Sequence, residues 1–394
     1  MIKLILSLSL ALISLDCLAQ IDYSKLIIGR NTGTKTLHDG NVTKIFGFTE
    51  TLNEVTDTPG PTIRVTEGDT VQIDFWNVSQ GAPHTIHLHG LDVNQENDGV
   101  PHLSFAVNHM DHGYYQFKAP HPGTYIYHCH VVSTIHVQAG MYGVIIVEPS
   151  NGSTNTTWVG GETFDRDILL TASEIDTNWH TEAVLDHEHD PANPIPVFVP
   201  EDYIPQYFLV NGLSETQLVD PLNHYTTGAN EHIFMRLVNI GYYGVRYIFP
   251  GSMNARTISS DGRPLPQDFV NDTIEVLPGE RYGTLIQTGT EAFYNVDVEY
   301  FNMNTQVVAS SQQVTLRTSL ASINKLELNL VIYPNPSENG LFHAVNAFTA
   351  DYTVYAVDGE MVLKSSEQLI DLSKQKPGMY IIRYQGSAVK LCVQ

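Results

Sequence analysis

The sequence predicts an all-β protein built from β-sandwiches. Two observations lead to this prediction. Short segments rich in β-branched and aromatic residues are separated by Gly, Pro, Asn or Asp, which is the pattern of strands joined by turns. Long amphipathic helical patterns are scarce. The clearest expected strands are residues 71–76, 143–147, 233–238 and 294–300.

Length and charge limit the kind of protein this can be. A chain of 394 residues with 42% hydrophobic residues suffices for two or three packed domains. The formal net charge is -23, and only 20 residues are Lys or Arg. Phosphate binding requires a concentrated basic surface, so we expect no nucleic-acid partner.

The N-terminus has the pattern of a secretory signal peptide. Lys3 precedes an apolar run over residues 4–15, and a small residue, Ala19, follows at the expected cleavage position. The run is too short to span a bilayer. Cys17 leaves a lipoprotein signal as an alternative, but Asp16 is charged where such signals carry small residues. We therefore expect residues 1–19 to be removed on export.

Cys129 is the centre of the most informative motif. It lies between His128 and His130, and a second histidine-rich run at residues 84–90 precedes it. A thiolate combined with imidazoles and a weak thioether selects copper of the blue, electron-transfer kind. The predicted ligands of this copper are His84, Cys129, His136 and Met141.

Strand geometry predicts a second group of ligands. Alternate side chains along a strand point to opposite faces, so His128 and His130 should face away from Cys129. By the same parity, His87 and His89 share one face while His84 can point to the other. We expect an outward shelf of four imidazoles, His87, His89, His128 and His130.

With these residues, the chain resembles the multicopper oxidases. Residues 87–90 match the family's His-x-His-Gly motif, and residues 128–141 match its His-Cys-His…His…Gly-Met motif. Five residues separate His130 from His136 where many members have three, so we expect a longer connecting loop. The resemblance implies type 1 copper at His84, Cys129, His136 and Met141, and type 2/type 3 copper at the four outward histidines.

Framework residues extend the resemblance over roughly residues 25–315. The implied fold is two cupredoxin-like Greek-key β-sandwiches, the second without a copper motif. The expected boundaries are a copper domain at 20–150, a linker at 151–162 and a second domain at 163–316. The matching segments are 59–71, 98–101, 122–125, 208–212, 236–239, 261–262 and 278–282.

The resemblance implies an oxidase that takes electrons from a reductant and passes them to dioxygen. Cys129, His128 and His130 would carry the electrons, and the reductant would be a phenol or a metal ion. The family's trinuclear cluster needs eight histidines, and this chain has four in the pattern. A homo-oligomer follows, either with two first domains face to face or as a trimer that pairs first with second domains.

Two other functions remain open. A copper nitrite reductase also joins a type 1 cysteine to an adjacent histidine ligand, but this chain has His87 where that family has a catalytic aspartate. His130 likewise replaces a small apolar residue of that family. The third possibility is a secreted electron-transfer or copper-binding protein that keeps only the type 1 site.

The C-terminal segment resembles the type A sorting domain of the type IX secretion system. Its Pro-Asn-Pro turn at 334–336 and its later strand patterns occur in the expected order. The resemblance implies a small β-sandwich at 331–394, after a linker at 317–330, that is recognised by outer-membrane secretion machinery. We then expect secretion or surface display by a Gram-negative bacterium, via the periplasm. An ordinary third β-domain is the alternative.

Overall fold

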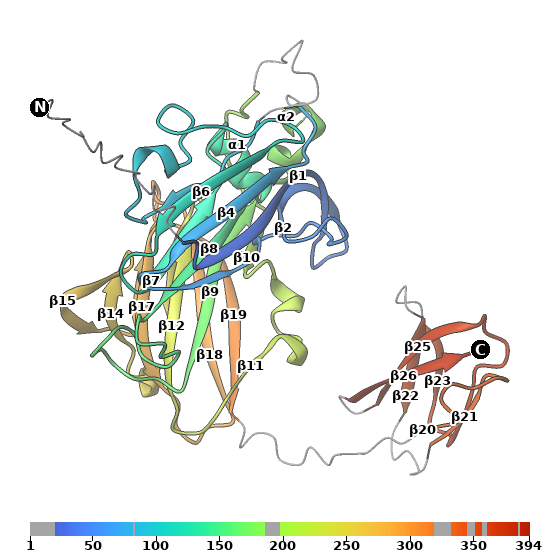
Figure 1. Ribbon diagram of the computed structural model, residues 1–394. Coiled ribbons are helices and arrows are strands. Elements are labelled where there is room, and N and C mark those ends of the chain that lie inside the picture. The colour runs from blue at the N-terminus through green and yellow to red at the C-terminus, as the bar shows by residue number, and fades with distance from the viewer. Residues whose placement is uncertain are drawn as a thin grey trace, which may run out of the picture. The chain divides into compact units, whose positions relative to one another are not determined.

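Strands dominate the computed structural model of the chain, which confirms the all-β prediction (Figure 1). Two compact units can be distinguished, residues 1–321 and 322–394. The predicted signal peptide and most of the 317–330 linker lie outside the described residues. The structure describes residues 20–81, 83–185, 198–318, 332–344, 351–356, 361–384 and 387–394.

The first sandwich consists of two four-stranded sheets, with orders β2-β1-β4-β6 and β3-β8-β7-β5. Pairs β1/β4 and β3/β8 are parallel. Strict alternation forms the core, since Val71, Ile73 and Phe75 of β4 are fully buried while the residues between them face outward. The strands are β1 (Tyr23–Thr36), β2 (Val42–Thr49), β3 (Ile63–Thr66), β4 (Thr70–Asn77), β5 (His87–His89), β6 (His112–Lys118), β7 (Gly123–His128) and β8 (Tyr142–Glu148).

The second sandwich has a six-stranded sheet, β10-β9-β12-β17-β14-β15, and a five-stranded sheet, β11-β19-β18-β13-β16. All four segments predicted most clearly as strands are strands, within β4, β8, β12 and β18. The strands are β9 (Arg166–Ile175), β10 (Tyr207–Val210), β11 (Tyr225–Thr227), β12 (His232–Asn239), β13 (Gly244–Ile248), β14 (Arg256–Ser260), β15 (Arg263–Val270), β16 (Thr273–Val276), β17 (Arg281–Gln287), β18 (Phe293–Phe301) and β19 (Val308–Thr318).

Helices are short and serve as connections. Within the described ranges, none is long and apolar enough to cross a bilayer. Helix α1 connects β7 to β8, and residues in the left-handed conformation, Val132 and Gly140, flank it. The helices are α1 (Ser133–Ala139), α2 (Glu182–Leu185), η1 (Gln95–Asn97), η2 (Thr177–His180), η4 (Glu215–Gln217), η5 (Pro221–Asn223) and η6 (Gly251–Met253).

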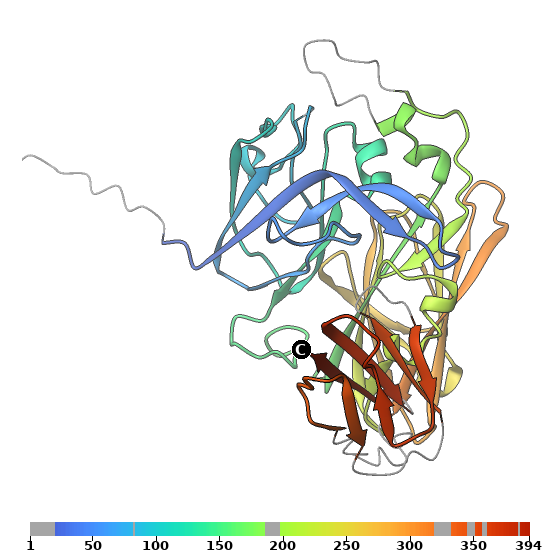
Figure 2. The same ribbon diagram turned by 90° about the vertical axis from the view of Figure 1, so that its right-hand side faces the viewer.

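The two sandwiches share an apolar and a charged interface, and Figure 2 shows the connection after β9 lying beside α1. Trp179, Val184 and Leu185, which follow β9, belong to the hydrophobic core of the first sandwich. Arg236 on β12 is buried, donates to Thr124 Oγ1 at 3.1 Å and pairs with Asp167 at 2.8 Å. A buried cation is tolerated only when paired in this way, so the interface has a fixed geometry.

The C-terminal unit is a small sandwich with its own core. Its sheets have the orders β20-β21-β24 and β23-β22-β25-β26. Phe342, Tyr352 and Ile382 are among its fully buried residues. Its strands are β20 (Ile332–Tyr333), β21 (Leu341–Ala344), β22 (Tyr352–Ala356), β23 (Met361–Ser365), β24 (Leu369–Asp371), β25 (Gly378–Tyr384) and β26 (Ser387–Val393).

Gly99 provides a test of how β5 is held. It has φ +80°, and a Cβ there would collide with the backbone of Ile86 and His87. We expect Gly99→Ala to lower the free energy of unfolding by about 2 kcal/mol or more, from left-handed strain plus the clash. Gly68→Ala is the control, because Gly68 has φ +91° but open space around it. Equal urea midpoints for the two variants would contradict the proposed clash.

Candidate metal centre

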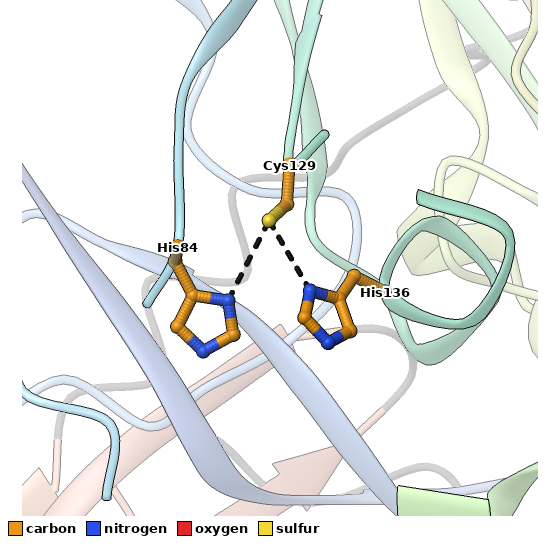
Figure 3. A group of neighbouring side chains, drawn as sticks. All are labelled: His84, Cys129 and His136. Carbon is orange, nitrogen blue, oxygen red and sulfur yellow. Dashed lines mark hydrogen bonds between the residues drawn. The ribbon is translucent and has the colours of Figure 1, made fainter. Parts of the chain in front are cut away.

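Three predicted ligands meet in the interior of the first sandwich, as Figure 3 shows. Cys129 follows β7, His136 lies on α1, and His84 lies just before β5, where it bridges Val107. Cys129 Sγ is 3.2 Å from His136 Nδ1 and 3.5 Å from His84 Nδ1. All three side chains are fully buried. We call this group, with Met141, the Cys129 centre.

Electrostatics prepare this group for a soft metal ion. Burial by itself raises the pKa of the Cys129 thiol, but His136 and His84 more than offset it and lower the pKa to about 5. The thiolate, which is the form that binds metals, is therefore favoured at neutral pH. One thiolate and two imidazole nitrogens around one point are the donor set of a blue copper site.

Helix α1 accounts for the long spacing between His130 and His136. The sequence suggested a longer loop, and the structure fills it with a short helix that places His136 beside the cysteine. The chain returns directly from this helix to the centre. Met141 is fully buried, its N–H donates to the His136 carbonyl, and its carbonyl accepts from the Cys129 N–H at 3.0 Å.

The four outward histidines form a second group, which we call the histidine shelf. His87 pairs with His128 across β5 and β7. The ligand atoms of His87, His89 and His128 lie within 4.8 Å of one another. His130 lies outside this tighter group, with its ring centroid 5.2 Å from that of His87. All four predicted shelf residues are thus neighbours, with His130 at the margin.

Two shelf rings are held in fixed orientations by backbone carbonyls. His87 Nδ1 is 2.7 Å from the Asp98 carbonyl, and His128 Nδ1 is 2.9 Å from the Cys129 carbonyl. Both Nδ1 atoms therefore donate, which leaves Nε2 as the ligand atom of each ring. Metal-binding histidines are commonly held by such hydrogen bonds, so the shelf has the features of a metal site.

Two shelf histidines, His89 and His128, favour the neutral form that binds metals. Burial lowers the pKa of His128 to about 3. Burial, reinforced by the nearby Arg281, lowers the pKa of His89 to about 4. Neutral imidazole is the ligand form, so these two residues need no deprotonation at neutral pH.

The second sandwich forms one wall of the shelf. His89 and His128 line a pocket of about 400 Å³ together with Tyr242 and Gly279 of that sandwich. Arg281 is buried, pairs with Asp261 at 2.8 Å, and lies against Gly90, where a side chain would collide with its guanidinium. In the described part of the chain, both candidate metal groups belong to the first sandwich, and the second sandwich supplies only this wall.

A hydrogen-bond network also fastens α1 to the second sandwich. The Gln138 amide donates to the Glu174 carbonyl at 3.1 Å and to the Tyr203 hydroxyl at 2.7 Å. Its oxygen accepts from the Asp176 N–H and lies 3.1 Å from His180 Nε2. Since His136 is on the same helix, this network helps to fix a ligand of the Cys129 centre.

Sequence reasoning missed several residues that shape the two groups. Asp98 and Arg281 lie in segments marked only as framework, with no role that their neighbours in the sequence could reveal. The position of Gln138, two residues after His136, was the one feature of the sequence that could have indicated its role. No feature of the sequence indicated a role for Glu174 or Tyr203. Their roles depend on contacts between residues far apart in the chain.

Comparisons with known proteins agree with this chemistry. Residues 44–152 match the multicopper oxidase family, and residues 331–393 match the secretion system C-terminal sorting domain. A copper-containing nitrite reductase of Neisseria meningitidis is 37% identical over 121 residues, 30% of this chain and 28% of that protein. The iron transport multicopper oxidase FET3 of Candida albicans is 28% identical over 273 residues, 66% of this chain and 37% of that protein.

Among solved structures, the blue copper oxidase of Nitrosomonas europaea has a TM-score of 0.59 at 24% identity. The match covers 77% of this chain and 89% of that chain, and it supports the fold alone. The chain spans less than half of the length of the two curated relatives above.

The β-sandwich fold, the donor set and the multicopper oxidase match over residues 44–152 together indicate a copper protein. More specifically, the chain carries a multicopper oxidase domain and a C-terminal sorting domain for export. Copper is therefore the metal that the two groups of ligands should hold. The sorting domain implies secretion or export to the cell surface.

Replacing the cysteine tests the Cys129 centre. We expect Cys129→Ser to abolish the intense visible band of the copper-loaded protein, because that band requires a copper–thiolate bond. Cys392→Ser is the matched control, since Cys392 is the other free cysteine of the described residues and lies in the C-terminal unit. The measurement is the visible spectrum of each variant after copper loading. A band that survives in Cys129→Ser would mean that another residue supplies the thiolate.

The buried carboxyl of Glu174 predicts a pH dependence of stability. Burial raises its pKa from 4.5 to about 7, so folding favours the protonated form. The stability that this proton provides is complete below pH 4.5 and is lost as the pH rises to about 7, a change of about 3 kcal/mol. We expect Glu174→Gln to remove this part of the dependence. Urea unfolding at pH 4.5 and at pH 7 measures the change in the free energy of unfolding, and Glu201→Gln, at an exposed position, is the control.

Proposed function

We propose that the chain is an exported copper oxidase that couples one-electron oxidation of a reductant to the reduction of dioxygen. The Cys129 centre would accept electrons, and the histidine shelf would contribute to the cluster that reduces dioxygen. The match of residues 44–152 to the multicopper oxidase family supports this reaction class. The name of the iron transport multicopper oxidase of Candida albicans favours a metal ion as the reductant, and a phenol remains the other candidate.

One observation supports the coupling of the two groups. Cys129 lies in the first group, its neighbour His128 lies in the second, and the Cys129 carbonyl accepts the hydrogen bond from His128 Nδ1 at 2.9 Å. The thiolate is therefore connected to a shelf ligand by a few covalent bonds, or by a route through the Cys129 carbonyl and this hydrogen bond. Such a short bonded connection favours electron transfer from Cys129 through His128 and His130.

Copper supplies the one-electron redox chemistry when bound. The protein supplies the rest of the site. The buried pocket excludes water from Cys129, the carbonyls of Asp98 and Cys129 orient the His87 and His128 rings, and the second sandwich closes the side at His89. Fixed ligands reduce the reorganisation that each electron transfer requires, which is the usual reason for a rigid site.

The four shelf histidines suggest a homo-oligomer. If the cluster needs eight histidines, a second copy must provide the rest. Two first sandwiches facing each other would present eight. The trimer that pairs a first with a second sandwich is less favoured, because no metal group is found in the described residues of the second sandwich. Export would proceed through the periplasm and an outer-membrane secretion machinery that recognises residues 331–393.

Nitrite reduction is a second candidate. The relative from Neisseria meningitidis bears that name, and the tight group of His87, His89 and His128 would suit a single copper ion. Against it, His87 stands where that family has a catalytic aspartate. An electron-transfer or copper-binding protein that uses only the Cys129 centre is the third candidate.

Copper per chain distinguishes these candidates. We expect about two and a half copper ions per chain with a blue band, since one centre per chain plus three shared ions per dimer give five per two chains. About one copper per chain would support electron transfer alone. About two per chain, with nitrite consumption under anaerobic conditions, would support a nitrite reductase. Metal analysis, the visible spectrum and a measurement of molecular size together distinguish the three candidates.

A shelf variant tests the division of labour. We expect His130→Ala to keep the blue band while dioxygen uptake falls by at least about a hundredfold, because the first centre stays intact and the second loses a ligand. His102→Ala is the control, since His102 lines the same pocket as His130 without belonging to the shelf. Loss of the band in His130→Ala would contradict the assignment of His130 to the second group.

A further inference from the structure

A buried carboxyl lies where the second sandwich meets α1, and its environment is unusual. Glu174 is 2% exposed and is the penultimate residue of β9. It accepts hydrogen bonds from the backbone N–H groups of Tyr242 and Tyr243 and from the Tyr203 hydroxyl at 3.0 Å. Its second oxygen, Oε2, is buried and has no hydrogen-bond partner among the described residues. Such burial costs folding free energy, so a carboxyl here calls for a functional reason.

Tyr203 is a partly buried tyrosine whose hydroxyl donates to a carboxylate, as does that of Tyr207, which donates to the exposed Asp39. The Tyr203 hydroxyl donates to Glu174 Oε1 and accepts from the Gln138 amide. Tyr247, fully buried in the second core, donates to backbone carbonyls instead. A phenol gives up an electron far more readily when its proton can leave at the same time. A carboxylate can take that proton, and a backbone carbonyl cannot.

Tyr203 is also the middle of an aromatic cluster. Its ring centroid is 5.2 Å from that of Trp179, 5.2 Å from that of Tyr242 and 6.2 Å from that of Tyr243. Tyr242 in turn lines the pocket that contains His89 and His128, and its hydroxyl donates to the Thr134 carbonyl of α1. Oxidisable rings in contact provide a route for electrons between this cluster and the wall of the shelf.

The same tyrosine is connected to the Cys129 centre. Gln138 donates to the Tyr203 hydroxyl and belongs to α1, two residues after His136. Trp179, Tyr203 and Tyr242 all pack on the core cluster that contains Cys129 and Met141. Hydrogen bonds therefore connect Tyr203 to Glu174 on one side and to α1, the helix of His136, on the other.

We propose that Tyr203 is a redox-active residue that delivers electrons to the oxidised copper of the Cys129 centre, with Glu174 as its proton acceptor. The Tyr203 O–H bond would break, with its proton moving to Glu174 Oε1 and one electron leaving, so that a neutral tyrosyl radical remains. Copper held by the Cys129 centre would supply the one-electron acceptor. The external reductant, a phenol or a metal ion, then returns one electron while Glu174 returns the proton. The electron destination rests on the oxidase function proposed above, whereas the Tyr203–Glu174 pair does not.

The pair is tested first in metal-free protein whose fold is verified by circular dichroism. Flash-generated ruthenium(III) tris-bipyridine oxidises tyrosines, and radicals on exposed rings recombine quickly, so the long-lived tyrosyl signal in optical and electron paramagnetic resonance spectra is the readout. We expect Tyr203→Phe to lose this signal and Glu174→Gln to reduce it about tenfold or more. Two controls should leave it unchanged: Tyr247→Phe, whose hydroxyl donates only to backbone carbonyls, and Tyr207→Phe, whose carboxylate partner Asp39 is exposed. A long-lived signal that persists in Tyr203→Phe overturns the proposal.

The electron destination is tested in the full chain loaded with cuprous copper, without oxygen. After the same flash, the tyrosyl radical should decay as the blue band grows, because the radical takes an electron from copper and Tyr203 regains its proton. We expect this coupled phase to disappear in Tyr203→Phe and to remain in Tyr247→Phe. Radical decay without growth of the blue band in the wild type overturns the link to copper. A protein that never develops a blue band refutes the oxidase function instead, since the metal-free measurement does not depend on it.

Discussion

The alternation of side chains at the end of β7 is the constraint on which the rest of the site depends. Residues 127, 128 and 129 have three different tasks within one extended segment. Tyr127 is buried in the core and donates to the Pro61 carbonyl, His128 joins the shelf, and Cys129 points to His84 and His136. A slip of one residue would exchange these faces and destroy both groups at once. Register in this strand is therefore as important to function as ligand identity.

Neighbouring structure holds that register in place. Gly143 on β8 leaves room for the Tyr127 ring, because a Cβ there would collide with it. On the other side, β5 is pinned by the turn at Gly99, whose left-handed backbone brings the Asp98 carbonyl to both the Leu88 N–H and the His87 ring. Packing at glycine positions and hydrogen bonds to carbonyls thus set the positions of the ligands before any metal ion binds.

The ligand types could be predicted from the sequence because metal-binding chemistry is local. A Cys between two histidines, followed by His136 and Met141, restricts the metal by donor type and spacing alone. The all-β class could also be predicted, because the composition of segments such as 71–76 and 233–238 is typical of strands. The helical form of the segment around His136 could not, because α1 has only seven residues and ends at Gly140 through backbone geometry. Short helices carry too little periodicity to identify.

The contribution of the second sandwich to the site could not be predicted from the sequence, for a different reason. Gln138 and Tyr203 are 65 residues apart, and the Arg281 side chain that faces Gly90 comes from a strand of the other sandwich. No local pattern encodes such contacts. These contacts give the second sandwich a structural role. It has no metal group among its described residues, but it fastens the helix of His136 and closes one side of the shelf.

This division gives a reason for the second sandwich, which has no metal group among its described residues, to accompany the sandwich of the Cys129 centre. An electron-transfer centre needs ligands that do not move, whereas α1 by itself is a short helix between two left-handed residues with little intrinsic stability. Fastening it through Gln138 to Glu174, Asp176 and His180 transfers rigidity from the larger sheet to the ligand. The Glu174 carboxyl is buried beside this contact, and burial raises its pKa to about 7. An amide could provide the same hydrogen-bond acceptor without the charge, so the proposed proton transfer from Tyr203 gives a reason for a carboxyl at this position.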